Sequence, residues 1–129
     1  EEKYYQKIPY ENPKISIDNL KEDYFGKIFG TRSGDKGGCA NLGVWAKSQE
    51  AYSFLYDFLT VKKLKELLPD LEKFEIDRFE LPNIYSLNFY VHGILQDGVS
   101  SSTRMDGQAK SLGEYLRAKK INFPEQLLK

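Results

Sequence analysis

Cysteine, histidine, methionine and tryptophan each occur only once among the 129 residues. A single cysteine, Cys39, excludes a disulfide within the chain. A single histidine and no carboxylate cluster with ligand spacing argue against a metal centre. We therefore expect neither a metal nor another cofactor.

The chain also lacks an excess of charge of either sign, with 19 basic and 19 acidic residues. Nucleic-acid-binding proteins normally carry a basic excess, so this class is disfavoured. No apolar run approaches the ~20 residues that cross a bilayer, and the N-terminal sequence Glu1–Tyr5 lacks the apolar core of a signal peptide. We expect a cytoplasmic protein that binds neither nucleic acid nor a membrane.

Aromatic residues are plentiful, at 14% of the chain, and such rings supply much of the buried area of a small core. The length suits one domain. Residues 1–22 form an N-terminal arm interrupted by Pro9 and Pro13, and residues 23–129 form a single domain. We expect the aromatic arm to pack either on its own domain or on a neighbouring subunit.

Apolar periodicity predicts the element order β-β-α-β-β-α. The expected strands are Tyr24–Thr31, Asn41–Lys47, Phe74–Leu81 and Tyr85–Leu95. The expected helices are Glu50–Leu59, a short helix between Thr60 and Pro69, and a last helix from Gly107, with Ser48, Thr60 and Asp106 as N-caps. Ile121–Lys129 is expected to be a short tail. An antiparallel sheet with helices packed on one face buries these elements, so the fold class is α+β.

Alternation within the strands predicts which residues share a face. In the second strand, Leu42, Val44 and Ala46 face one way and Asn41, Gly43 and Trp45 the other. In the fourth strand, Ser86, Asn88, Tyr90 and His92 lie opposite an apolar set. The third strand changes phase between Ile76 and Phe79, which predicts a bulge near Asp77–Arg78.

The stretch Thr31–Gly43 contains four glycines between two apolar segments. Glycines let a loop turn its N–H groups toward one point, and Arg32 and Lys36 would add positive charge to such an anion site. The alternative is a hairpin loop in which Asp35 neutralises Arg32 or Lys36. The stretch matches neither the P-loop nor the dinucleotide fingerprint, because no helix follows it.

A second polar stretch, Ser100–Ser111, leads into the last expected helix, where N–H groups and the helix dipole favour an anion. Arg104 and Lys110 add positive charge there. The alternative is an ordinary strand-to-helix connection capped by Asp106. If the fold joins the two stretches, they form either a polar pocket or a salt-bridge network pairing Arg32 with Asp106 and Arg104 with Asp35.

His92 and Cys39 each have two interpretations. Histidine titrates near neutral pH and is a common general base, but a half-buried strand residue with a hydrogen-bonded ring explains His92 more simply. A thiol beside oriented N–H groups gains reactivity. However, no histidine is local to Cys39, which favours a small buried residue.

Several motifs in order along the chain resemble the AtuA-like domain, from the family named for acyclic terpene utilisation. They are Arg32–Gly37, Ala40–Gly43, Leu59–Thr60, Glu80–Asn83, Leu87–Phe89, Gly98–Ser100, Arg104–Asp106 and Lys110–Leu112. The resemblance spans about Phe25 to Leu116 and implies a ferredoxin-like α+β sandwich. It also implies a link to the breakdown of branched acyl compounds, without naming a reaction.

The resemblance supplies most of the candidate ligand-binding residues. The full set is Arg32, Ser33, Gly34, Asp35, Lys36, Gly37, Asn41, Asn88, Ser102, Arg104, Asp106 and Lys110. The sequence departs from the family pattern at Gly38–Cys39 and at Ala109. The module is usually the C-terminal part of a longer protein, so we expect a larger partner subunit that carries the other family domain.

Three functions fit these residues. The first is an auxiliary module that binds an anionic small molecule, of carboxylate or acyl-coenzyme A type, or a partner enzyme, and that forms a homo-oligomer. The second is the small subunit of a hydratase, lyase or isomerase acting on a carboxylate or acyl thioester, with Asp35, Asp106 or His92 moving a proton. The third is a purely structural domain.

Overall fold

The computed structural model of the protein describes residues 10–15, 19–36, 39–93 and 112–128. Its strands are β1 (Leu20–Tyr24), β2 (Gly30–Lys36), β3 (Cys39–Trp45), β4 (Ile76–Leu81), β5 (Ser86–Val91) and β6 (Lys120–Pro124). Its α-helices are α1 (Gln49–Phe58), α2 (Val61–Leu67) and residues 112–117. Short 3-10 turns cover Phe25–Lys27, Pro69–Leu71, Pro82–Ile84 and Glu125–Leu128.

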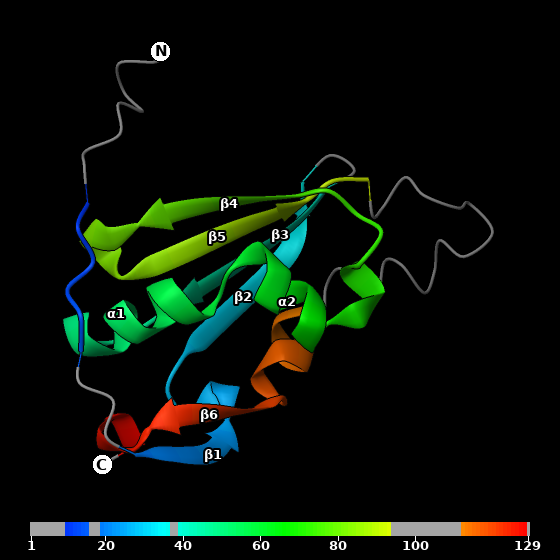
Figure 1. Cartoon of the computed structure of the whole chain (residues 1–129). Helices are drawn as coiled ribbons and strands as arrows, with labels where there is room; N and C mark the ends of the chain where they lie inside the picture. Colours follow the sequence, from blue (N-terminus) through cyan, green and yellow to red (C-terminus); the bar gives the residue numbers. More distant parts are fainter. Residues whose placement is uncertain (1–9, 16–18, 37–38, 94–111, 129) are drawn as a thin grey trace.

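The larger sheet has four strands in the order β2-β3-β5-β4, and every neighbouring pair is antiparallel. Helices α1 and α2 lie on one side of this sheet (Figure 1). The β2–β3 hairpin confirms that the glycine-rich stretch joins two antiparallel neighbours. The predicted α+β class, with an antiparallel sheet and helices packed against it, is confirmed.

A second, two-stranded sheet was not predicted. It pairs β1 with β6, from Leu20 opposite Pro124 to Tyr24 opposite Lys120. The expected tail from Ile121 is therefore wrong, because β6 buries Ile121 and Phe123 in the core. The element order accordingly has two more strands than predicted. The expected boundary between residues 22 and 23 falls inside β1.

The first predicted strand, Tyr24–Thr31, is also wrong in its first half. Phe25–Lys27 forms a 3-10 turn, and β2 begins at Gly30. Phe25 and Phe29 are both buried, with ring centroids 4.9 Å apart. Two buried rings four residues apart need a turn between them, because an extended strand would place them about 13 Å apart along its axis.

The predicted bulge in the third strand is absent, because β4 keeps an unbroken register with β5 from Ile76 to Leu81. The change of phase is real but has another cause. Phe79 and Leu81 point away from the core and are 47% and 41% exposed. Phe79 instead packs edge-on against Tyr90 of β5, at 5.5 Å between ring centroids.

Two predicted helix starts are confirmed in atomic detail. Ser48 Oγ accepts a hydrogen bond from the Ala51 N–H, and Thr60 Oγ1 accepts one from the Lys63 N–H. Both bonds satisfy N–H groups that a helix leaves free at its first turn. In residues 112–117, Leu112 and Leu116 are buried as predicted, but Tyr115 is 51% exposed. The expected Asp106 cap lies outside the described residues.

The four-stranded sheet has two chemically different faces. The inner face packs against the helices and buries Leu42, Val44, Leu87, Phe89 and Val91. The opposite, outer face carries the alternate residues of the same strands, and the burial patterns of β3 and β5 confirm the predicted alternation. Its members are Gly30, Arg32, Gly34, Cys39, Asn41, Gly43, Trp45, Asp77, Phe79, Leu81, Ser86, Asn88, Tyr90 and His92.

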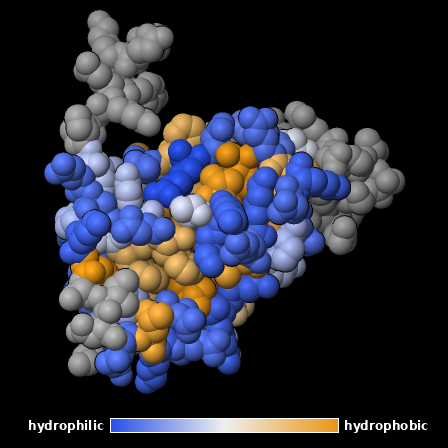
Figure 2. Space-filling view, viewed as in Figure 1, coloured by the Kyte–Doolittle hydropathy of each residue, from blue (hydrophilic) through white to orange (hydrophobic). Residues whose placement is uncertain are grey.

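The surface seen from the side of the helices is mixed. Hydrophobic residues gather around α1 and toward β6, and hydrophilic residues surround them (Figure 2). Among the described residues, no helix combines the length and apolar character that crossing a membrane requires.

Candidate functional site

The candidate residues Arg32, Gly34, Asn41 and Asn88 lie on the outer face of three adjacent strands. Arg32 of β2 is opposite Gly43 of β3, and Gly43 is in turn opposite Asn88 of β5. Asn41 of β3 lies two residues along from Gly43, between Gly34 and Tyr90. One guanidinium and two amides therefore share a single surface within two rows of the sheet.

Gly34 and Gly43 place no side chains between these polar groups. A Cβ atom on Gly34 would meet nothing within 4 Å. A Cβ on Gly43 would lie 3.8 Å from the Arg32 carbonyl oxygen and from Asn88 Oδ1, which is ordinary contact. Packing does not demand glycine at either position, so the two residues leave this part of the face open to an incoming group.

Arg32 supplies the positive charge of this surface. Its side chain is exposed, and within the described parts of the chain no carboxylate pairs with it. The neighbouring acceptor Asn41 Oδ1 is buried and has no hydrogen-bond donor among the described residues. A buried acceptor without a donor costs free energy.

Ser33 faces the inner side instead. Its Oγ accepts a hydrogen bond of 3.1 Å from the Gly113 N–H, while Thr31 Oγ1 donates to the Gly113 carbonyl at 2.9 Å. A Cβ on Gly113 would lie 2.7 Å from Thr31 Oγ1, so this close approach requires glycine. Gly113, which follows the second polar stretch, is thus hydrogen-bonded to β2.

The residues that precede the second polar stretch lie at the hairpin end of β3, where His92 contacts Cys39. His92 and Gly93 follow β5, whose end lies beside the β2–β3 hairpin (Figure 1), and Gly93 has a positive φ of 81°. Both described flanks of the second polar stretch therefore adjoin the strands of the first. The association of the two stretches stays a prediction, because Ser100–Ser111 lies outside the described residues.

The remaining candidates have no described side chain. Asp35 and Lys36 belong to β2, but the description of that part of the strand is limited to its backbone. Gly37, Ser102, Arg104, Asp106 and Lys110 lie outside the described residues. The pairs Arg32–Asp106 and Arg104–Asp35 therefore stay predictions.

His92 joins two other groups on the outer face. Its Nε2 atom lies 2.8 Å from Asp77 Oδ2, and its Nδ1 atom lies 3.6 Å from Cys39 Sγ. The expected hydrogen-bonded, half-buried histidine is confirmed. The interpretation of Cys39 is corrected: its side chain is partly exposed and its partner is His92, 53 residues away.

Sequence reasoning missed Asp77 and the link to Cys39. The alternation of side chains along the strands is the signal from which the contact between Cys39 and His92 could have been predicted. Starting the second strand at Cys39 instead of Asn41 puts Cys39 on the face of Asn41, and the β3–β5 register then carries it next to His92. Within the described residues no three His, Cys, Asp or Glu side chains are arranged so that they could hold a metal ion.

A family model described as the AtuA ferredoxin-like domain matches residues 25–122. The chain belongs to this family. The match includes the whole four-stranded sheet and confirms the resemblance carried by the motifs. No curated protein and no solved structure shows a significant match to the chain. The ferredoxin-like α+β fold is therefore established by the family, whereas the outer-face groups must be interpreted from their chemistry.

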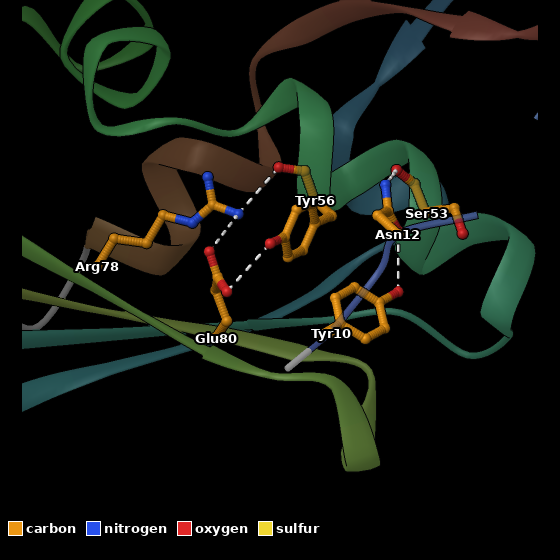
Figure 3. Close-up of polar contacts among 6 residues, drawn as sticks. All are labelled: Tyr10, Asn12, Ser53, Tyr56, Arg78 and Glu80. Carbon is orange, nitrogen blue, oxygen red and sulfur yellow. Dashed lines mark hydrogen bonds and ion pairs between the residues drawn. The ribbon is translucent and has the colours of Figure 1, made fainter. Parts of the chain in front are cut away.

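On the inner side of this AtuA ferredoxin-like domain, a polar cluster joins α1 to β4 (Figure 3). Arg78 Nη2 donates to the Tyr56 carbonyl at 2.9 Å, and Tyr56 Oη donates to Glu80 Oε1 at 3.1 Å. The guanidinium also lies over the Tyr56 ring, 5.0 Å from its centroid. Burial, together with the hydrogen bond to Glu80, raises the pKa of Tyr56. These groups bond to one another, which indicates a structural role, although Arg78 Nε is buried without a partner among the described residues.

The described part of the N-terminal arm extends the same cluster. Tyr10 Oη donates to Asn12 Oδ1, and Asn12 Nδ2 donates to the Ser53 carbonyl of α1 (Figure 3). The Tyr10 ring packs 5.1 Å from that of Tyr56, centroid to centroid. Of the two expectations for the arm, packing on its own domain is confirmed for residues 10–15.

A small cavity of about 180 Å³ lies on the helical side of the domain. Leu68, Leu71, Leu112 and Tyr115 line it together with Pro69, Asp70 and Lys119. Its lining is mostly apolar and includes none of the candidate residues. The outer face of the sheet is therefore the better candidate for the functional surface.

Proposed function

We propose that this AtuA ferredoxin-like domain is an auxiliary binding module for an anionic small molecule of carboxylate or acyl-coenzyme A type. The observation that supports it is the grouping of Arg32, Asn41 and Asn88 on one open face, with Gly34 and Gly43 between them. We further propose that this ligand belongs to acyl or terpenoid catabolism, as the resemblance to the AtuA-like family implies.

The proposed chemistry uses one strong contact and several orienting ones. The Arg32 guanidinium can donate two parallel hydrogen bonds to a carboxylate or phosphate, and such charge-assisted pairs are the stronger hydrogen bonds of proteins. The Asn88 amide lies one strand beyond Gly43 and can donate to the same ligand. In the proposed complex, Arg104 and Lys110 of the second polar stretch add positive charge.

The apolar side chains of the outer face suggest a second contact. Trp45 and Leu81 are 38% and 41% exposed in the row of the sheet next to that of Arg32, and Phe79 lies in the row of Arg32 itself. Exposed apolar groups that share one face are typical of protein contact surfaces. We propose that a second copy of the chain, or the larger family subunit, covers these apolar side chains and that the ligand binds beside this contact, at Arg32.

The ligand proposal is tested by thermal unfolding with phosphate, citrate, succinate, coenzyme A and acetyl-coenzyme A. A ligand at a hundred times its dissociation constant adds about 2.7 kcal/mol to the stability of the folded state. For a chain of this size that is a shift of roughly 8 °C in Tm. We expect one class of anion to give such a shift with the wild type and to lose it with Arg32→Ala.

Arg117→Ala is the matched control, because Arg117 is also exposed but belongs to the helix on the inner side. It should keep the full ligand-induced shift. Without ligand, Arg32→Ala should change the free energy of unfolding by less than about 0.5 kcal/mol, as for other exposed side chains. A loss above about 2 kcal/mol, with no ligand shift in the wild type, would instead identify Arg32 as part of a structural ion-pair network.

A further inference from the structure

The Cys39, His92 and Asp77 side chains come from three adjacent strands or strand ends and form one hydrogen-bonded chain on the outer face. We propose that Cys39 is a nucleophilic thiol, activated by His92, that accepts an acyl group from a thioester. His92 is held in place by the sheet, since its N–H donates to the Glu75 carbonyl at 2.8 Å, which extends the β4–β5 pairing.

The distances from His92 to Asp77 and to Cys39 indicate which ring nitrogen carries the proton. The Asp77 carboxylate only accepts hydrogen bonds, so His92 Nε2, at 2.8 Å from it, carries the proton. When the ring is neutral, its unprotonated Nδ1 faces Cys39 Sγ, at 3.6 Å. This is the order nucleophile, base and orienting carboxylate that activates thiols and hydroxyls in proteins.

The proposed step balances without another reactant. The Cys39 proton moves to His92 Nδ1, and the thiolate sulfur attacks the thioester carbonyl carbon. The new Cys39 sulfur–carbon bond forms, the bond between the carbonyl carbon and the leaving sulfur breaks, and the imidazolium returns its proton to the leaving thiolate. Asp77 is a positioning residue that stabilises the imidazolium.

Access and binding surface both suit such a substrate. The His92 and Asp77 side chains are 40% and 51% exposed, and Cys39 is partly exposed. Tyr90 lies two residues before His92 on the same face and packs on Phe79. The two rings offer an apolar surface that extends from His92 along the outer face, on which the chain of a long acyl group can lie.

This inference does not rest on anion binding by Arg32. It uses other side chains and a covalent readout. Loss of the anion-dependent Tm shift in Arg32→Ala therefore tests the binding proposal, whereas the experiments below test the thiol.

The first measurement is the rate at which iodoacetamide alkylates Cys39, followed by intact mass spectrometry. The chain has one cysteine, so the modified site is unambiguous. A free thiol is only a few per cent ionised at neutral pH, so a base that takes up its proton increases the fraction of reactive thiolate. Part of this gain is lost, because a thiolate whose thiol ionises more easily is a weaker nucleophile. We therefore expect His92→Gln to slow alkylation roughly three- to tenfold.

Asp77→Asn should slow alkylation to a similar extent, and Asp77→Glu should restore part of the rate. Asp57→Asn is the matched control, because it removes an exposed carboxylate from α1, which lies on the inner side of the sheet, away from the thiol (Figure 1). It should leave the alkylation rate unchanged. Circular dichroism and Tm measurements check that each variant is folded. If His92→Gln does not fold, the alkylation rate of Asp77→Asn tests the proposal instead.

The second measurement is acyl transfer from acetyl-coenzyme A and octanoyl-coenzyme A. We expect one acyl adduct per chain, release of one coenzyme A thiol, no adduct in Cys39→Ser and a faster reaction with the octanoyl thioester. The absence of an adduct in the folded wild type would overturn the proposal, even if alkylation depended on His92. Equal adduct rates in wild type and His92→Gln would overturn it as well.

Discussion

The inner and outer faces of the four-stranded sheet are made by the same strands, yet different physical demands select their residues. The inner face buries Leu42, Leu87 and Phe89 completely. The outer face, one residue along each strand, carries Asn41, Asn88 and Arg32 at partial or full exposure. Packing accounts for the first set and leaves the second unexplained. The polar outer residues are therefore more informative about function, and the core residues about folding.

The largest expected effect separates two neighbours on β5. Phe89→Ala should cost about 3–5 kcal/mol of unfolding free energy, because it leaves a cavity in the core, whereas Asn88→Ala should cost less than about 1 kcal/mol. Urea unfolding followed by fluorescence measures both. Similar losses in the two variants would mean that the outer face is also part of the packed structure.

A smaller effect separates two glycines of β2 that share the outer face. A Cβ on Gly30 would collide with the Trp45 indole, whereas a Cβ on Gly34 would meet nothing within 4 Å. Gly30→Ala should therefore cost about 1–3 kcal/mol, and Gly34→Ala should be nearly neutral. In a Trp45→Ala background the cost of Gly30→Ala should largely disappear. An undiminished cost there would show that the ring is not its cause.

The smallest effect concerns Tyr52, whose buried hydroxyl has no hydrogen-bond partner among the described residues. Burial raises its pKa above the ordinary value of 10.0, with a further contribution from Tyr10. The folded state then keeps a proton that the unfolded chain releases, so this contribution to stability is complete below about pH 10 and falls as the pH rises further. Tyr52→Phe should remove that part of the alkaline decline.

At neutral pH the same variant should gain up to about 1 kcal/mol, because an unpaired polar group leaves the core. Urea unfolding between about pH 8 and about pH 11 tests both statements. Tyr56→Phe is the comparison, since its hydroxyl is bonded to Glu80 and its loss should not stabilise the fold. An alkaline decline that is as steep in Tyr52→Phe as in the wild type would contradict the assignment.

Local patterns predicted the features that depend on neighbours along the chain. The caps at Ser48 and Thr60, the β2–β3 hairpin and the alternation in β3 and β5 were all predicted. Each depends on residues a few positions apart, where hydrogen bonding and burial leave a direct trace in the sequence.

Long-range contacts explain what was missed. The pairing of β1 with β6 joins opposite parts of the chain, and nothing near Ile121 indicates a partner. Phe79 was assumed to face the core because it is apolar, but its partner is Tyr90 on the outer face. Cys39 and His92 are separated by 53 residues, so their contact follows only from the strand register. The motifs predicted Arg32, Asn41 and Asn88 as candidates, but not that they share one surface.

The pairing of Leu20 with Pro124 also has a consequence for the order in which the protein is made and folded. The two-stranded sheet closes a loop of about a hundred residues, at an entropic cost of roughly 4 kcal/mol. During synthesis the four-stranded sheet can pair first, but β1 must wait until β6 leaves the ribosome. A nascent chain that stops short of β6 would lack Ile121 and Phe123 and would leave β1 without its partner.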